Sequence, residues 1–136
     1  MDNSISLRTL SDKFHKLVSE FNIHPDCKRF WTTPQHDGSP HVEREGNCYY
    51  YVVTERGSER ERIATKDPDE ILYLLVRDVT FAVAIQYELN NRIEGKDGRA
   101  MFFPYQEKLL SEIKPEWGDR KRKEHLEVLK KHPFGT

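Results

Sequence analysis

The sequence contains little that would place it in a membrane or among disulfide-rich secreted proteins. Only two of its 136 residues are cysteine, and an isolated pair without motif spacing favours free thiols in a reducing compartment. No stretch of 18 consecutive apolar residues occurs, so we expect no membrane-spanning helix. The opening residues MDNSISLRTLSDKF lack a basic segment followed by an apolar core. We therefore expect no signal peptide and a cytoplasmic location.

An excess of one charge is also missing. The chain has 22 basic and 23 acidic residues, for a formal net charge of −1. Bulk charge thus favours neither nucleic acids nor membranes as partners, and only local patches could bind them. The length suits one domain over residues 1–136, with enough chain to bury a core.

Catalytic motifs are absent as well. The glycine-rich phosphate loops, the G-x-S-x-G elbow and the H-E-x-x-H zinc motif do not occur. Cys27, His36, His41 and Cys48 share one stretch, but none of them forms the closely spaced ligand pair typical of structural zinc. We predict no catalytic site, no metal and no cofactor. An enzyme that uses these cysteines and histidines is the weakest of the three functions considered.

Apolar periodicity predicts four helices. Their expected ranges are residues 7–21, 68–94, 102–113 and 115–132. Ser4 or Ser6 is suited to cap the first helix, and Asp67 before Pro68 is suited to cap the second. Gly95 is a natural stop for that long helix.

Three strands are expected between the first two helices. The segments HVERE, CYYYVVTER and ERERIAT are separated by the turn signals Gly46-Asn47 and Gly57-Ser58. The same counting places Glu55 opposite Arg60. The predicted fold class is therefore α+β: an N-terminal helix, a three-stranded antiparallel meander, a long central helix and two C-terminal helices.

The tyrosine-rich central strand raises the question of what its second face is for. The predicted register places Val42, Arg44, Tyr49, Tyr51, Val53, Arg60 and Arg62 on one face, and His41, Glu43, Tyr50, Val52, Glu61 and Ile63 on the other. Because Ile63 belongs to the second set, we expect that set to pack on the long helix. The first face would then present tyrosine and arginine, which anchor protein interfaces. The alternative is that the N-terminal helix covers this face and its tyrosines are core.

Several blocks of the sequence resemble a known family. They are DGSPHVE, YYYVVTERG, TKDPDEILYLLVRDVTFAVAIQYELNNRIEGKDGR, LLSEIKPEW and KKHPF, between Asp37 and Phe134. In this order they are similar to the immunity protein 63 family of bacterial polymorphic toxin systems. The positions that carry the resemblance include Glu55, Arg56, Gly57, Glu88, Arg92, Asp97 and Arg99.

The resemblance implies a cytoplasmic, non-catalytic antidote. Such a protein would bind a cognate toxin domain encoded by the adjacent gene, as in contact-dependent growth inhibition, and we expect a monomer that binds one to one. The predicted partner-binding residues are Tyr49, Tyr51, Glu55, Arg56, Arg60, Arg62, Glu88 and Arg92. The main alternative is a small nucleic-acid-binding or regulatory module that uses the tyrosine and arginine face for stacking and phosphate contacts.

Overall fold

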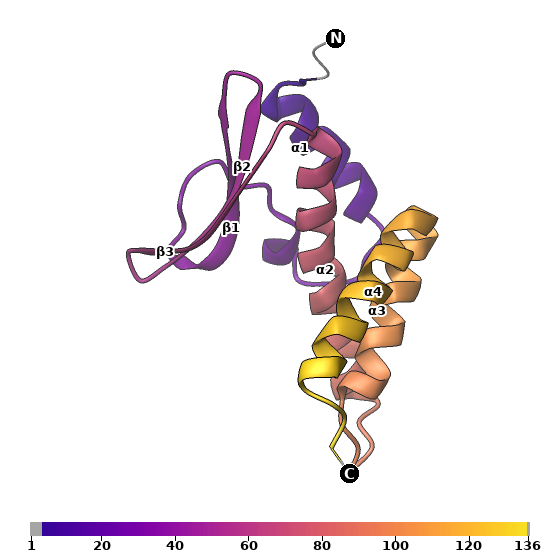
Figure 1. The fold of residues 1–136 in the computed structure, drawn as a ribbon. Helices are drawn as coiled ribbons and strands as arrows, with labels where there is room; N and C mark the ends of the chain where they lie inside the picture. The colour runs from indigo at the N-terminus through magenta and orange to yellow at the C-terminus, as the bar shows by residue number, and fades with distance from the viewer. Residues whose placement is uncertain (1–3, 136) are drawn as a thin grey trace. The chain divides into compact units, whose positions relative to one another are not determined.

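The computed structural model describes residues 4–135 and has the predicted α+β class. An N-terminal helix precedes three antiparallel strands, and three helices follow (Figure 1). The elements are α1 (Leu7–Val18), the short 3-10 helix η1 (Pro25–Lys28), β1 (Asp37–Glu45), β2 (Cys48–Glu55), β3 (Ser58–Thr65), α2 (Pro68–Asn90), α3 (Arg99–Ile113) and α4 (Pro115–Lys131). Within the described residues, no helix is both long and apolar enough to cross a membrane.

The chain divides into two compact units. The sheet unit contains the residues up to Glu20 and His24–Val76, and the helical unit contains Phe21–Ile23 and the residues from Arg77 onward. The first part of α2 thus belongs to the sheet unit and the second part to the helical unit. Each unit is described by itself below.

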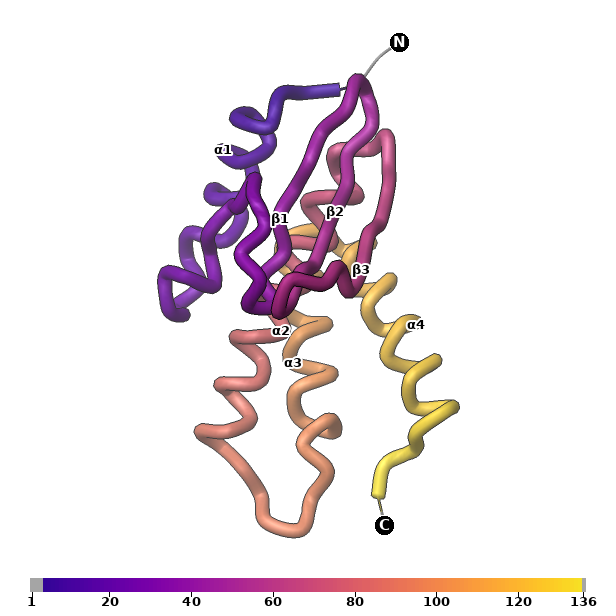
Figure 2. Tube along the Cα trace, turned by 90° about the vertical axis from the view of Figure 1, so that its left-hand side faces the viewer, coloured from indigo at the N-terminus to yellow at the C-terminus, as the bar shows by residue number. Residues whose placement is uncertain are grey.

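The first hairpin of the sheet unit has the predicted register. The sheet order is β1-β2-β3, and the strands lie side by side in Figure 2. Glu45 pairs with Cys48, so Gly46 and Asn47 form the connection, and Val42 lies opposite Tyr51. The turn signal alone was sufficient here because no irregularity intervenes between Pro40 and the turn.

The second hairpin differs from the prediction at its turn. Glu55 pairs with Ser58, which makes Arg56 and Gly57 the two central residues. Their φ angles are +52° and +79°, and a two-residue hairpin turn of type I′ requires positive φ at both positions. The predicted Gly57-Ser58 turn is wrong by one residue, and Glu55 does not lie opposite Arg60.

A β-bulge follows this turn. Thr54 pairs with Glu59 and Val53 with Glu61, so Arg60 is an extra residue on β3. A bulge moves the remaining pairing by one position and increases the local twist. Such an insertion leaves no mark in the alternation of polar and apolar residues, and sequence counting therefore missed it.

The combined shift reverses the faces of β3. Ile63 lies opposite Tyr51 and Arg62 lies opposite Val52. The prediction grouped Ile63 with Tyr50 and Val52, and Arg62 with Tyr51, and it is wrong for both β3 residues. A register error of one residue exchanges the two faces of a strand, since side chains alternate with period two.

The tyrosine face of β2 belongs to the core of the sheet unit. Tyr49 and Tyr51 are 0% and 2% exposed. The main-chain N–H of Ile5 donates to the Tyr49 hydroxyl at 2.7 Å, and that hydroxyl donates to the Ile5 carbonyl. Ser6 caps α1 by accepting from the N–H of Thr9. Figure 1 shows α1 and the first turns of α2 on the same side of the sheet.

In the helical unit, α3 and α4 run antiparallel (Figure 2) and approach each other closely at Gly118. A Cβ built on Gly118 of α4 would lie 1.6 Å from the hydroxyl oxygen and 2.7 Å from the Cβ of Ser111 on α3. Only glycine allows this approach. Helix α2 ends at Asn90 rather than near Glu94, and Gly95 lies in the connection to α3 with a φ of +80°.

Candidate protein-binding site

The structure separates the eight predicted partner-binding residues into three groups. Tyr49 and Tyr51 lie in the core of the sheet unit and present almost no surface. Glu55, Arg56, Arg60 and Arg62 lie on the β2–β3 hairpin, whereas Glu88 and Arg92 lie in the helical unit. Of the two explanations for the tyrosine face, the structure selects burial by the N-terminal segment.

The end of the β2–β3 hairpin presents exposed charges. Glu55, Arg56 and Arg60 are all exposed. The main-chain N–H of Arg56 donates to the carbonyl of His36 at 3.0 Å, which holds the turn against the preceding loop. Two arginines on a fixed backbone offer guanidinium donors for a carboxylate or phosphate group of a partner.

A polar cluster lies on the face of the sheet opposite to Tyr49 and Tyr51, which we call the outer face. The Arg62 guanidinium donates to Glu59 at 2.6 and 3.0 Å and to Glu43 at 3.2 Å. It also lies 5.3 Å from the centre of the Tyr50 ring, within the range of a cation–π contact. His41 completes the cluster, with its Nε2 2.7 Å from a Glu43 carboxylate oxygen.

The electrostatics of this cluster keep both of its carboxylates ionised. The hydrogen bond from His41, followed by the contact with Arg62, lowers the pKa of Glu43 against the opposing effect of burial. The hydrogen bonds from Arg62 likewise lower the pKa of Glu59. With His41 counted as neutral, two carboxylates and one guanidinium give a formal charge of −1.

Sequence reasoning missed most of this cluster. It selected Arg62 but assigned it to the tyrosine face, away from Glu43 and Tyr50. His41 is 1% exposed and its Nδ1 has no hydrogen-bond partner among the described residues. The alternation of charges in ERER could have identified the cluster only if the bulge at Arg60 had been known.

At the connection between α2 and α3, Glu88 and Arg92 form a two-pronged ion pair. Two guanidinium nitrogens of Arg92 donate to the two carboxylate oxygens of Glu88 at 3.0 Å each. The Glu88 residue is only 4% exposed, whereas the Arg92 side chain is 61% exposed. The hydrogen bonds from Arg92 lower the pKa of Glu88 against the effect of burial.

The absence of a side chain at Gly98 leaves room for the buried Glu88 carboxylate. A Cβ at Gly98 would lie 3.0 Å from both Cδ and Oε1 of Glu88, so a larger residue would push the side chain aside. A small pocket of about 270 Å³ opens beside it. The pocket is lined by Glu88, Ile93, Lys96, Asp97, Gly98, Ala100 and Met101.

A second ion pair fixes the C-terminal end of the helical unit. Arg99 donates to both carboxylate oxygens of Asp97, the shortest contact being 2.7 Å. It also donates to the carbonyls of His132 and Pro133. The side-chain hydrogen bonds from Arg99, and then its main-chain N–H, lower the pKa of Asp97 to about 2. These contacts hold the end of α4 against the α2–α3 connection.

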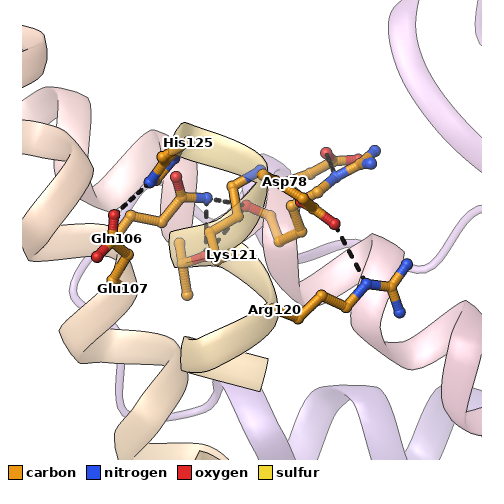
Figure 3. Close-up of polar contacts among 9 residues, drawn as sticks. Asp78, Gln106, Glu107, Arg120, Lys121 and His125 are labelled. Carbon is orange, nitrogen blue, oxygen red and sulfur yellow. Dashed lines mark hydrogen bonds and ion pairs between the residues drawn. The ribbon is translucent and has the colours of Figure 1, made fainter. Parts of the chain in front are cut away.

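A buried polar network joins the helices of this unit (Figure 3). The Gln106 amide donates to the Arg77 carbonyl at 2.9 Å and to the Thr80 hydroxyl at 3.3 Å. His125 lies 2.6 Å from a Glu107 carboxylate oxygen. These contacts connect α3 to α2 and to α4.

Two residues of the basic run 120–123 on α4 pair with an acidic residue of the same helix. Glu124 contacts Arg120 at 3.2 Å and Lys121 at 3.1 Å. Among residues 4–135, no group of three or more His, Cys, Asp and Glu side chains is placed to hold a metal ion.

Comparison with known protein families identifies the family of this chain. Residues 45–127, more than half of the chain, match the family described as immunity protein 63. The chain belongs to this family. The resemblance seen in the sequence blocks is thereby confirmed. Searches of curated proteins and of solved structures found no match.

The immunity protein 63 match covers the elements that carry both charged groups. It includes β2, β3, α2 and α3 and most of α4. Glu59 and Arg62 of the sheet cluster lie inside it, as do the pairs Glu88–Arg92 and Asp97–Arg99, while His41 and Glu43 precede it.

Proposed function

We propose that this chain is an antidote that binds a cognate toxin domain encoded by the adjacent gene and blocks its activity without catalysis. The observation that carries the proposal is membership of the immunity protein 63 family over residues 45–127. The proposed protein acts in the cytoplasm of the producing cell, as a monomer that binds one toxin domain. A specific complex of this kind buries about 1,200–2,000 Å² in total.

The charged residues of the β2–β3 hairpin are the proposed contacts in the sheet unit. Glu55, Arg56 and Arg60 are exposed around the turn, and Arg62 is held in place by Glu59 and Glu43. Arginine is enriched among residues that dominate binding energies, because its planar group forms several directed hydrogen bonds.

In the helical unit, the Glu88–Arg92 pair is the proposed contact. The buried Glu88 carboxylate fixes the exposed Arg92 guanidinium in one orientation. A side chain that is already ordered loses less conformational entropy when a partner binds. The two tyrosines of the original prediction are not proposed as contacts, because they are buried.

Burial of Tyr49 and Tyr51 also removes the basis of the nucleic-acid alternative. Recognition of single-stranded nucleic acid by stacking requires exposed aromatic faces. These two rings pack inside the sheet unit instead, and we therefore do not propose nucleic-acid binding.

The test is neutralisation of the toxin domain encoded by the neighbouring gene. Co-production of this chain should restore growth of cells that produce the toxin, and the purified proteins should form a one-to-one complex. The Arg56→Glu/Arg60→Glu variant should protect less well, whereas Arg122→Glu/Lys123→Glu on α4, which changes the net charge by the same amount, serves as a matched control. A toxin that stays lethal and forms no complex with the folded wild-type chain would contradict the proposal.

A further inference from the structure

The two edges of the sheet differ in how they are covered. The outer edge of β1 is met by the preceding loop, where Trp31 forms a parallel bridge with His41 and its carbonyl accepts from the N–H of Val42 at 2.9 Å. Strand β3 forms the other edge and, within the described residues, pairs with β2 alone. Its outward main-chain groups are therefore available to a further strand.

The open edge is long enough to hold such a strand. Strand β3 has eight residues, Ser58–Thr65, which span roughly 27 Å at about 3.4 Å per residue. All of them are exposed except Ile63 and Thr65, which are half-buried. The edge also lies entirely inside the stretch that matches the family, whereas all of β1 except Glu45 lies outside it.

Hairpin geometry identifies the outward main-chain groups. The closing pair of a two-residue hairpin, here Glu55 and Ser58, exchanges hydrogen bonds across the two strands. Inward and outward groups alternate from there, with Arg60 as the additional bulge residue. Arg62 and Ala64 therefore direct their N–H and C=O groups towards the open edge, and Ile63 directs its groups towards β2.

The carboxylates of the outer cluster favour a basic side chain at their place on the partner, whereas Arg56 and Arg60 nearer the turn favour an acidic group. Glu43, Glu59 and Arg62 lie on the outer face with a formal charge of −1. Two copies of the chain paired through β3 would bring together two clusters whose charges are already paired within each copy. A segment with lysine or arginine facing Glu43 and Glu59 would instead add attraction.

We propose that an extended segment of the toxin domain, with a lysine or arginine facing Glu43 and Glu59, pairs with β3 as a fourth strand of this sheet. This inference rests on the proposed function and names the part of the toxin that the sheet unit recognises. Main-chain pairing supplies binding that depends little on the side chains, and the outer cluster selects the basic side chain.

Residue-resolved hydrogen exchange tests the pairing with the unmodified chain. In the free protein the amide hydrogens of Arg62 and Ala64 should exchange quickly, and in the toxin complex they should exchange at least about tenfold more slowly. The amide of Ile63, which faces β2, should be protected in both states. A complex in which Arg62 and Ala64 still exchange at their free rates would overturn the inference while leaving the proposed function intact.

Two further outcomes of that experiment are also decisive. Protection of Ala64 in the free chain that increases with protein concentration would show β3 paired with a second copy, against this proposal. If no complex with the toxin forms, the proposed function fails, and the inference fails with it.

A pair of substitutions at Ala64 provides an independent measurement. Ala64→Pro removes the outward N–H and places a ring at the edge, whereas Ala64→Val keeps the N–H and suits a strand. We expect toxin affinity to fall at least about tenfold for the proline variant and to change less than about threefold for the valine variant. Equal affinities of two folded variants would overturn the inference. If the proline variant fails to fold, the exchange rates of the wild-type complex decide.

Discussion

The sheet unit and the helical unit distribute their side chains in opposite ways. The sheet unit buries Tyr49 and Tyr51 and leaves the charges of its β2–β3 hairpin exposed. The helical unit buries the carboxylate of Glu88 and leaves Leu89 and Ile93 each 55% exposed. Residue type alone therefore did not indicate which side chains are available to a partner. In the sheet unit, strand register determines which side chains are exposed. In the helical unit, the Glu88–Arg92 pair beside Gly98 determines it.

The exposed aromatic rings of the helical unit already have partners. Phe81 contacts Phe102 edge-to-face with 5.9 Å between ring centres, and Tyr87 stacks on Tyr105 at 4.0 Å. The outer edge of β3 has no such partner within the described residues. For this reason we propose that toxin recognition uses the charges and main chain of the hairpin rather than these aromatic rings.

The largest predicted effect contrasts a core aromatic residue of one unit with an exposed one of the other. Tyr51→Ala should reduce the free energy of unfolding by about 3–5 kcal/mol, because it leaves a cavity in the core. Phe81→Ala should cost less than about 1 kcal/mol, since Phe81 is 47% exposed. Urea denaturation of both variants measures the difference, and similar costs would contradict the assignment of Tyr51 to the core.

The next effect concerns the close approach of α3 and α4. Gly118→Val should destabilise the protein by about 1–3 kcal/mol, since its Cβ would overlap Ser111. Adding Ser111→Gly removes the atoms nearest to that Cβ and should recover part of the loss. A double-mutant cycle measures this coupling. Strictly additive effects would mean that the two residues do not meet.

A smaller, pH-dependent effect is predicted at His125. Burial lowers the pKa of His125 from its usual value of 6.5, although the Glu107 carboxylate opposes the shift. The folded state then binds this proton less readily than the unfolded state. The contribution to stability is therefore complete above about pH 6.5 and is lost as the pH falls below it, by at most about 1.4 kcal/mol per pH unit.

The control for this prediction is His125→Phe. Phenylalanine can keep the stacking on Phe103, where the two ring centres now lie 3.7 Å apart, but it cannot bind a proton. Denaturation of both proteins between pH 7.5 and 5 should show a steeper loss for the wild type. If the stability of both proteins falls equally as the pH is lowered, a group other than His125 is responsible for the pH dependence.

The smallest effect on stability is expected at the surface cluster of the sheet. Arg62→Ala removes ion pairs whose side chains are 40–46% exposed, and exposed pairs of this kind contribute little to folding. The thermal midpoint should therefore stay close to that of the wild type, while toxin binding becomes weaker because Arg62 no longer holds the Glu43 and Glu59 carboxylates in place for the toxin. A large loss of stability with unchanged binding would identify Arg62 as a structural residue instead.

Much of the fold could be predicted from local sequence signals. Caps and apolar periodicity located all four α-helices, and Gly46-Asn47 fixed the first hairpin. The second hairpin could not be predicted, because Arg56 adopts a positive φ that is uncommon for arginine, and the bulge at Arg60 has no periodic signal.

The candidate site was less accessible to sequence reasoning than the fold. Glu88 and Arg92 form an ion pair across a spacing of four residues, which is visible in the sequence. The burial of Glu88 depends on Gly98, which approaches it from beyond the end of α2. The cluster of His41, Glu43 and Arg62 depends on strand register, which the sequence did not specify correctly.

Calorimetric titration with the toxin domain tests the central assignment most directly. Wild type, Arg56→Glu/Arg60→Glu and Phe81→Ala should be compared at one salt concentration, after each variant has been shown to unfold cooperatively. We expect the hairpin variant to bind at least about tenfold more weakly, a loss of about 1.4 kcal/mol, and Phe81→Ala to bind as the wild type does. Undiminished binding by the hairpin variant together with a loss for Phe81→Ala would contradict the account and place recognition on the helical unit.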